Sequence, residues 1–184
     1  MVIYFATSNL NKFKEAKEML GAKGIPIEHF SFKHNEIRSD SVEEIAAEAV
    51  SAAYSQLGKP VFVEDTGLFI DTLNGFPGTY SAWAAKKIGS TGIMKLMQGE
   101  ENRTAYFKTC IALMNGKSTK IFSASCAGSI ATESRGESGF GYDPIFVPEG
   151  YDKTFAESIG LKNKLSHRYK SLLLLSEYLL SNKI

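Results

Sequence analysis

The longest pair of strands predicted in this chain flanks a single dipeptide, Asn115-Gly116. The segments on either side, RTAYFKTCIALM and KSTKIFSASCAGSI, are rich in β-branched, aromatic and small residues. Asn-Gly favours a two-residue hairpin turn because both residues tolerate positive φ. The sequence therefore predicts a long antiparallel hairpin in which Met114 faces Lys117.

The two cysteines fall on opposite strands of this hairpin. In the predicted register Cys110 faces Ile121 and Cys126 faces Ala105, which separates the two cysteine backbones by roughly 17 Å at ~3.4 Å per residue. A disulfide requires Cα atoms within about 7 Å of each other. We therefore expect two free thiols that pack in the core.

Strand and helix patterns alternate in the first part of the chain. Ser41 and Glu44 form a capping box, and Gly21 and Gly58 are typical helix ends. Strands are expected at residues 2–6, 26–32 and 59–71, and helices at about 13–20, 42–57, 81–89, 90–98 and from 167. Alternation followed by a hairpin predicts a single α/β domain, residues 1–184, with a mixed sheet.

The composition of the chain limits the classes of binding partner that we expect. The chain has 184 residues, of which 43% are hydrophobic and 22% charged, and its formal net charge is +1. This balance does not favour binding to nucleic acid or to an anionic membrane. The sequence shows no signal peptide, and LLLLSEYLL is too short to span a bilayer, so a cytoplasmic protein is expected.

The segment ATSNLNK joins the first strand to the first helix. Ser and Asn are good N-caps, but one cap accounts for only one polar residue. A helix N-terminus also presents free N–H groups and a partial positive charge to an anion. The hydroxyls, amides and lysine that crowd this connection favour a phosphate site, although the GxxxxGK[ST] pattern is absent.

Two acidic segments are candidates for chemistry. In VEDTG, Glu64 and Asp65 interrupt an apolar strand and precede the hydroxyl of Thr66. Side chains alternate along a strand, so both acids reach one site only if the strand ends there. Either acid alone is most simply a solvated edge residue, and Glu36 alone is most simply a solvated loop residue. Glu36 and Asp65 together could supply the carboxylates that Mg²⁺ prefers beside substrate phosphates.

The loop GFGYDP places Phe140 between two glycines. A phenyl ring there suits stacking on a purine base, which is worth roughly 1–3 kcal/mol, although a core anchor is an equally good interpretation.

The segment KNKLSHR is predicted to begin a helix and to gather cations there. Lys162, Lys164 and Arg168 would oppose the helix dipole at that end, a cost that a nearby anion would relieve.

Taken in order, these motifs resemble the inosine triphosphate pyrophosphatases. The residues that carry the resemblance are TSNLNK, Glu36, VEDTGLFID, NGFPGTYSA, GFGYDPIF, TFAE and SHR. They extend from about residue 3 to residue 170. The resemblance implies Mg²⁺-dependent hydrolysis of ITP, dITP and XTP to the monophosphate and pyrophosphate by a homodimer. It also implies an elongated α/β fold with a long curved mixed sheet and a cleft between two lobes.

The resemblance further assigns roles to residues. Asp65 and Glu36 would hold the metal, and Asp65 would accept the proton of the attacking water. The phosphates would contact Thr7, Ser8, Asn9, Leu10, Asn11 and Lys12, and Thr66 would touch the nucleotide. The base and sugar would lie among Phe140, Gly141, Tyr142, Asp143, Lys162, His167 and Arg168. A guanidinium only donates, so Arg168 would satisfy the 6-oxygen of hypoxanthine or xanthine and reject the 6-amino group of adenine.

Three other functions stay open on the sequence. A phosphotransferase would need an acceptor site, and a nucleotide-sensing module would gain little from two carboxylates. A pyrophosphatase acting on other modified nucleotides is the remaining alternative. The role of Glu64, the relative preference among the three substrates and the feature that excludes GTP cannot be read from the residues.

Overall fold

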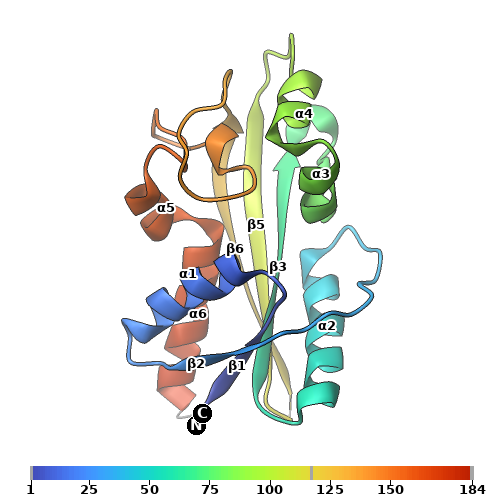
Figure 1. The fold of residues 1–184 in the computed structure, drawn as a ribbon, viewed down its shortest axis with the longest axis vertical. Helices are drawn as coiled ribbons and strands as arrows, with labels where there is room; N and C mark the ends of the chain where they lie inside the picture. Colours follow the sequence, from blue (N-terminus) through green and yellow to red (C-terminus); the bar gives the residue numbers. More distant parts are fainter. Residues whose placement is uncertain (1, 117, 183–184) are drawn as a thin grey trace. The chain divides into compact units, whose positions relative to one another are not determined.

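A computed structural model describes residues 2–116 and 118–182 (Figure 1). Six helices and seven strands are present in this part of the chain. The strands are β1 (Ile3–Ala6), β2 (Ile27–Phe30), β3 (Val61–Ile70), β4 (Pro77–Gly78), β5 (Thr104–Met114), β6 (Thr119–Ile130) and β7 (Phe146–Pro148). The helices are α1 (Leu10–Gly21), α2 (Val42–Leu57), α3 (Ser81–Lys87), α4 (Gly89–Leu96), α5 (Ile159–Leu165) and α6 (His167–Asn182). Two short 3-10 turns cover Asp71–Leu73 and Asp143–Ile145.

The sheet is mixed, as predicted. Its strand order is β2-β1-β3-β5-β6-β7, and β4 pairs with β3. β1 runs parallel to β2 and to β3, whereas β4 is antiparallel to β3 and β7 is antiparallel to β6. This arrangement confirms the α/β class.

The chain divides into two compact units, which share strands β3, β5 and β6. Unit 1 comprises the described parts of residues 1–65, 109–124 and 168–184, and unit 2 comprises residues 66–108 and 125–167. Each unit has its own hydrophobic cluster. The cluster of unit 1 includes Phe5, Leu20, Phe62, Leu113 and Leu175. The cluster of unit 2 includes Leu68, Ile93, Phe107, Phe146 and Phe155. A single domain and a cleft between lobes stay predictions.

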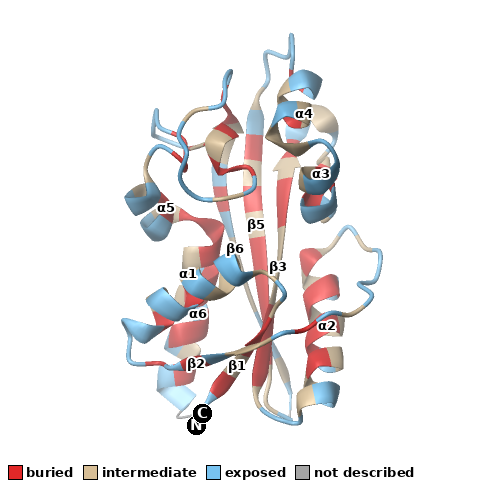
Figure 2. Ribbon diagram, viewed as in Figure 1, coloured by how far each residue is buried: buried red, intermediate tan, exposed pale blue. Residues whose placement is uncertain are grey.

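The signals that mark the two ends of α2 in the sequence are found in the structure. Ser41 Oγ caps α2 by accepting from Glu44 N at 3.3 Å, and Gly58 ends the helix at φ 66°. The capping box is only half formed, because the carboxylate of Glu44 accepts from Ser39 Oγ instead. The buried residues of α2 recur at helical spacing along one side, as Figure 2 shows.

The hairpin prediction is confirmed for its two strands, β5 and β6. The expected pairing of Met114 with Lys117 lies outside the described residues. Cys110 and Cys126 are both buried free thiols, as expected. No helix in the described part of the chain is long and apolar enough to cross a membrane.

Two expectations were wrong. The strand expected to begin at Val2 begins at Ile3, and Val2 is exposed. The final helix, α6, begins at His167 as expected, but Lys162 and Lys164 do not belong to its start, because they lie on a separate helix, α5, which ends at Leu165. Lys162 and Lys164 therefore lie in the last turn of α5, where the helix dipole favours cations. The sequence did not predict α5, because this helix is short and has neither a side-chain cap nor an acidic first turn.

Candidate functional site

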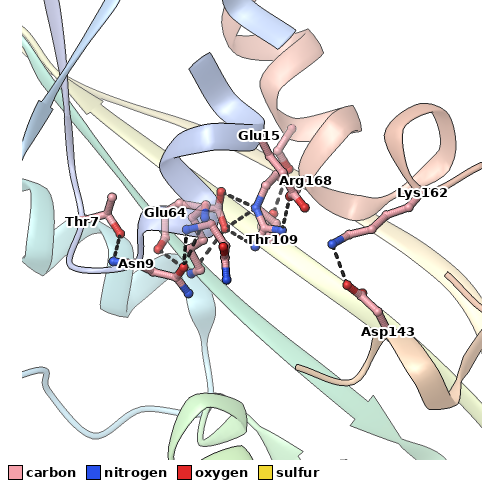
Figure 3. A network of polar contacts seen from close by, with 11 residues as sticks. Thr7, Asn9, Glu15, Glu64, Thr109, Asp143, Lys162 and Arg168 are labelled. Carbon is pink, nitrogen blue, oxygen red and sulfur yellow. Dashed lines mark hydrogen bonds and ion pairs between the residues drawn. The ribbon is translucent and has the colours of Figure 1, made fainter. Parts of the chain in front are cut away.

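The connection between β1 and α1, residues 7–12, is held by its own side chains (Figure 3). Asn9 is the N-cap, and its Oδ1 accepts from the backbone N–H groups of Asn11 and Lys12 at 3.0 and 3.2 Å. Thr7 Oγ1 accepts from Asn9 N at 3.0 Å, and Thr7 N donates to Phe30 O at 3.1 Å. The loop is therefore shaped before any ligand arrives.

This capping leaves a defined set of groups for an anion. Within the described residues, the backbone N–H groups of Ser8 and Leu10 have no hydrogen-bond partner. The side chains of Ser8 and Asn11 are exposed beside them. The first turn of α1 carries no acidic residue, so its partial positive charge is not offset locally. The loop can bind phosphate oxygens.

Lys12 completes the loop from the first turn of α1. Its Nζ lies 3.2 Å from the carbonyl oxygen of Glu64 and 3.3 Å from Glu64 Oε1, and its side chain is 17% exposed. An ammonium group has three donors, so two contacts to Glu64 leave one donor for a ligand oxygen. Glu64 thus fixes the position of the cation.

The carboxylate of Glu64 also binds Arg168 (Figure 3). Arg168 Nε donates to both Glu64 oxygens at 3.0 and 2.9 Å, and Nη2 donates to Oε1 at 2.8 Å. Arg168 Nη1 donates to Glu15 Oε2 at 2.8 Å. The side chain of Glu64 is 0% exposed and that of Arg168 4%. This cluster of Lys12, Glu15, Glu64 and Arg168, here called the acid–base cluster, contains two cations and two carboxylates.

The carboxylates of the acid–base cluster affect the pKa of the Arg168 guanidinium. Burial by itself lowers the pKa of the guanidinium, but the carboxylates of Glu64 and Glu15 outweigh burial and hold this pKa above its ordinary value. Arg168 lies in the first turn of α6, where the dipole disfavours a cation. The anion expected to relieve that cost is Glu64, together with Glu15.

Glu36 and Asp65 stay the predicted pair of metal ligands. β3 continues through the acids to Ile70, so Glu64 and Asp65 leave opposite faces of the strand. Glu36 is exposed and makes no hydrogen bond or ion pair with any described residue. No group of three or more His, Cys, Asp or Glu within the described residues could hold a metal ion. Carboxylate oxygens fit Mg²⁺ chemically, but substrate oxygens and water would have to complete its shell.

Unit 2 contains the aromatic loop, residues 139–143. Asp143 Oδ2 accepts from Phe140 N at 2.7 Å and from Lys162 Nζ at 2.7 Å, and both charged side chains are buried. Lys162 Nζ lies 4.3 Å from the centroid of the Phe140 ring. A Cβ added at Gly139, which has φ 78°, would lie 2.2 Å from Asp143 Oδ2. The loop is therefore folded around one buried ion pair.

Other predicted site residues of unit 2 take structural positions. Tyr142 belongs to the core cluster and donates to Ser81 O at 3.1 Å, and burial raises the pKa of its hydroxyl to about 12. His167 is buried, with its ring 4.4 Å from that of Phe107. Gly141 is exposed at φ 65°, and Thr66 is half-buried on β3.

Sequence reasoning missed two residues near the loop of residues 7–12. Glu15 lies one turn after Lys12 on α1, a spacing that places both on one side of the helix and could have indicated it. His29 Nε2 lies 2.8 Å from Thr7 O. No local pattern could have shown this contact, because it depends on the pairing of β1 with β2.

We expect the Glu64→Gln variant to lose stability, because it leaves two cations without their buried counter-charge. Removing one partner of a buried ion pair costs roughly 3 kcal/mol or more. The matched control is Glu15→Gln, whose side chain is 23% exposed and whose loss should cost about 1 kcal/mol or less. Urea unfolding of both variants measures the difference. Equal losses would show that Glu64 is not the centre of the cluster.

Comparison with known proteins bears on this geometry. The chain matches the model of the Ham1 family over residues 3–178. It is 48% identical over 184 residues to the dITP/XTP pyrophosphatase of Methanopyrus kandleri, covering 99% of this chain and 98% of the relative. It is 46% identical over 184 residues to the dITP/XTP pyrophosphatase of Pyrococcus horikoshii, with the same coverage.

Solved structures agree. The Ham1 protein of Staphylococcus aureus superposes with a TM-score of 0.85 at 30% identity, covering 98% of this chain and 99% of that one. A HAM1 protein from Coxiella burnetii gives a TM-score of 0.87 at 31% identity, with the same coverage. The resemblance recognised in the sequence is confirmed. The chain belongs to the Ham1 family.

Proposed function

We propose that this chain hydrolyses ITP, dITP and XTP to the nucleoside monophosphate and pyrophosphate. Family membership and the names of the two relatives support the proposal. The observation that carries it is the loop of residues 7–12: it combines two available backbone N–H groups, polar side chains and a positioned lysine at the start of α1. A triphosphate is the ligand that such a set suits.

The proposal gives each group a role. Lys12 neutralises charge that builds on the phosphate oxygens, and the carboxylate of Asp65 orients and deprotonates the attacking water. Thr66 contacts the nucleotide. The triphosphate is assigned to Thr7, Ser8, Asn9, Leu10, Asn11 and Lys12. The base and sugar are assigned to Phe140, Gly141, Tyr142, Asp143, Lys162, His167 and Arg168.

Mg²⁺ is the proposed cofactor, with Glu36 and Asp65 as its protein ligands. When bound, the ion would supply positive charge to the phosphates and acidify water. The remaining ligands would come from the substrate and water, as is usual for Mg²⁺. By the same family resemblance, the proposed assembly is a homodimer and the proposed location is the cytoplasm, where nucleotide pools lie.

The reaction is tested by its products. The protein is incubated with ITP and Mg²⁺, and the phosphorus-containing products are separated. We expect IMP and pyrophosphate, because a phosphotransferase would release IDP and a sensing module would release nothing.

The Asp65→Asn variant, which keeps the shape of the side chain, should bind ITP and lose turnover by several orders of magnitude. Near-normal kcat in the folded variant would remove Asp65 from the mechanism.

The metal assignment is tested separately with Glu36→Gln. The substitution keeps an oxygen donor but removes the charge that attracts the cation, so half-maximal activity should require several-fold more Mg²⁺. Glu28→Gln is a matched control, because Glu28 is an exposed acid on β2. The two Mg²⁺ titrations are compared at saturating ITP. Identical curves for both variants would remove Glu36 from the metal site.

Base selection is tested with Arg168→Lys and Phe140→Ala. Lysine keeps a cation beside Glu64 but loses the planar donor set, so kcat/KM for ITP should fall and its ratio to that for ATP should shrink. Stacking is available to every purine, so Phe140→Ala should lower kcat/KM for ITP and for ATP by the same factor. If Arg168→Lys lowers kcat/KM for ITP and for ATP equally, Arg168 serves the acid–base cluster. Recognition of the base would then be reassigned to the aromatic loop.

A further inference from the structure

His29 touches the loop of residues 7–12 from the neighbouring strand. β2 runs parallel to β1 with His29 opposite Phe5, and His29 Nε2 lies 2.8 Å from the carbonyl oxygen of Thr7. A carbonyl oxygen only accepts, so Nε2 must carry the proton. The imidazole ring also packs against Phe13 of α1, with ring centroids 4.8 Å apart. The side chain is therefore fixed on two sides.

This contact sets the orientation of one peptide bond. The peptide that joins Thr7 to Ser8 is planar and trans, so its C=O and N–H point in opposite directions. Because His29 holds the C=O of Thr7, the N–H of Ser8 must point away from His29. The hydrogen bond from Thr7 N to Phe30 O holds the preceding peptide as well.

The Ser8 amide is one of the few donors that this loop can offer. The amides of Asn9, Asn11 and Lys12 are taken by Thr7 and Asn9 side chains. A rotated Thr7–Ser8 peptide would present a carbonyl oxygen, rather than an N–H, to the anion. The orientation of this one peptide therefore changes a donor into a repulsive acceptor.

We infer that His29 is a positioning residue that aims the Ser8 N–H at a substrate phosphate. It touches no substrate atom and acts through the Thr7 carbonyl. The inference deepens the proposed function, on which its phosphate assignment rests. Inorganic pyrophosphate with Mg²⁺ is a suitable probe, because it carries the anion without the base and is not consumed by the proposed reaction.

The test compares two substitutions by calorimetry with pyrophosphate. His29→Phe keeps a ring against Phe13 and removes the donor, whereas His29→Gln keeps an N–H donor. Loss of one neutral hydrogen bond corresponds to about a three- to tenfold weaker affinity. We expect that weakening for His29→Phe and a return to near the original affinity for His29→Gln. With ITP, His29→Phe should raise KM by a similar factor and leave kcat within about twofold.

Two results would overturn the inference. One is unchanged affinity in both variants, and the other is an equal loss in both, which would trace the effect to packing. If His29→Phe does not fold, the unsubstituted protein still decides: adding pyrophosphate must shift the Ser8 amide signal in an NMR spectrum, and an unmoved signal rejects the role. Failure of the proposed function is distinguishable, because pyrophosphate binding and the Ser8 shift need no ITP turnover.

Discussion

The buried carboxylate of Glu64 is the interaction on which unit 1 depends. It accepts from Arg168 on α6 and lies within 3.3 Å of the Lys12 ammonium on α1. One side chain of β3 therefore fixes the starts of two helices. Because the side chain of Glu64 is fully buried, its charge has to be met by protein cations. The residue that the sequence left without a role becomes the organiser of its neighbours.

Buried ion pairs of this kind are weak sources of stability. Desolvation of the charged groups offsets most of their mutual attraction, and apolar residues often replace such pairs without loss. Unit 2 nevertheless contains a second one, Asp143 with Lys162, which also holds the Phe140 N–H. In both units the buried carboxylate binds a cation and lies next to a loop assigned to substrate. We therefore infer that these two buried ion pairs serve mainly to hold the geometry of the loops beside them.

The sequence predicted the local features well. The ends of α2 and the strands flanking Asn115-Gly116 follow from short-range chemistry that each residue carries with it. Free cysteines followed from strand spacing alone. The alternation rule also predicted that two acids on a continuous strand diverge, and the continuity of β3 decided that question.

The contacts that the sequence could not supply are those between distant segments. Arg168 was assigned to the base from its motif, yet its partner Glu64 lies 104 positions away and shares no pattern with it. The same holds for His29, 22 positions from Thr7, whose contact follows from the register of β2 on β1. Sequence motifs thus indicate which residue types gather around a substrate. Tertiary pairing decides which of them touch it and which hold the others in place, and in the acid–base cluster one guanidinium already binds two carboxylates. Any contact from Arg168 to a purine must therefore be made by a group whose orientation Glu64 and Glu15 have set.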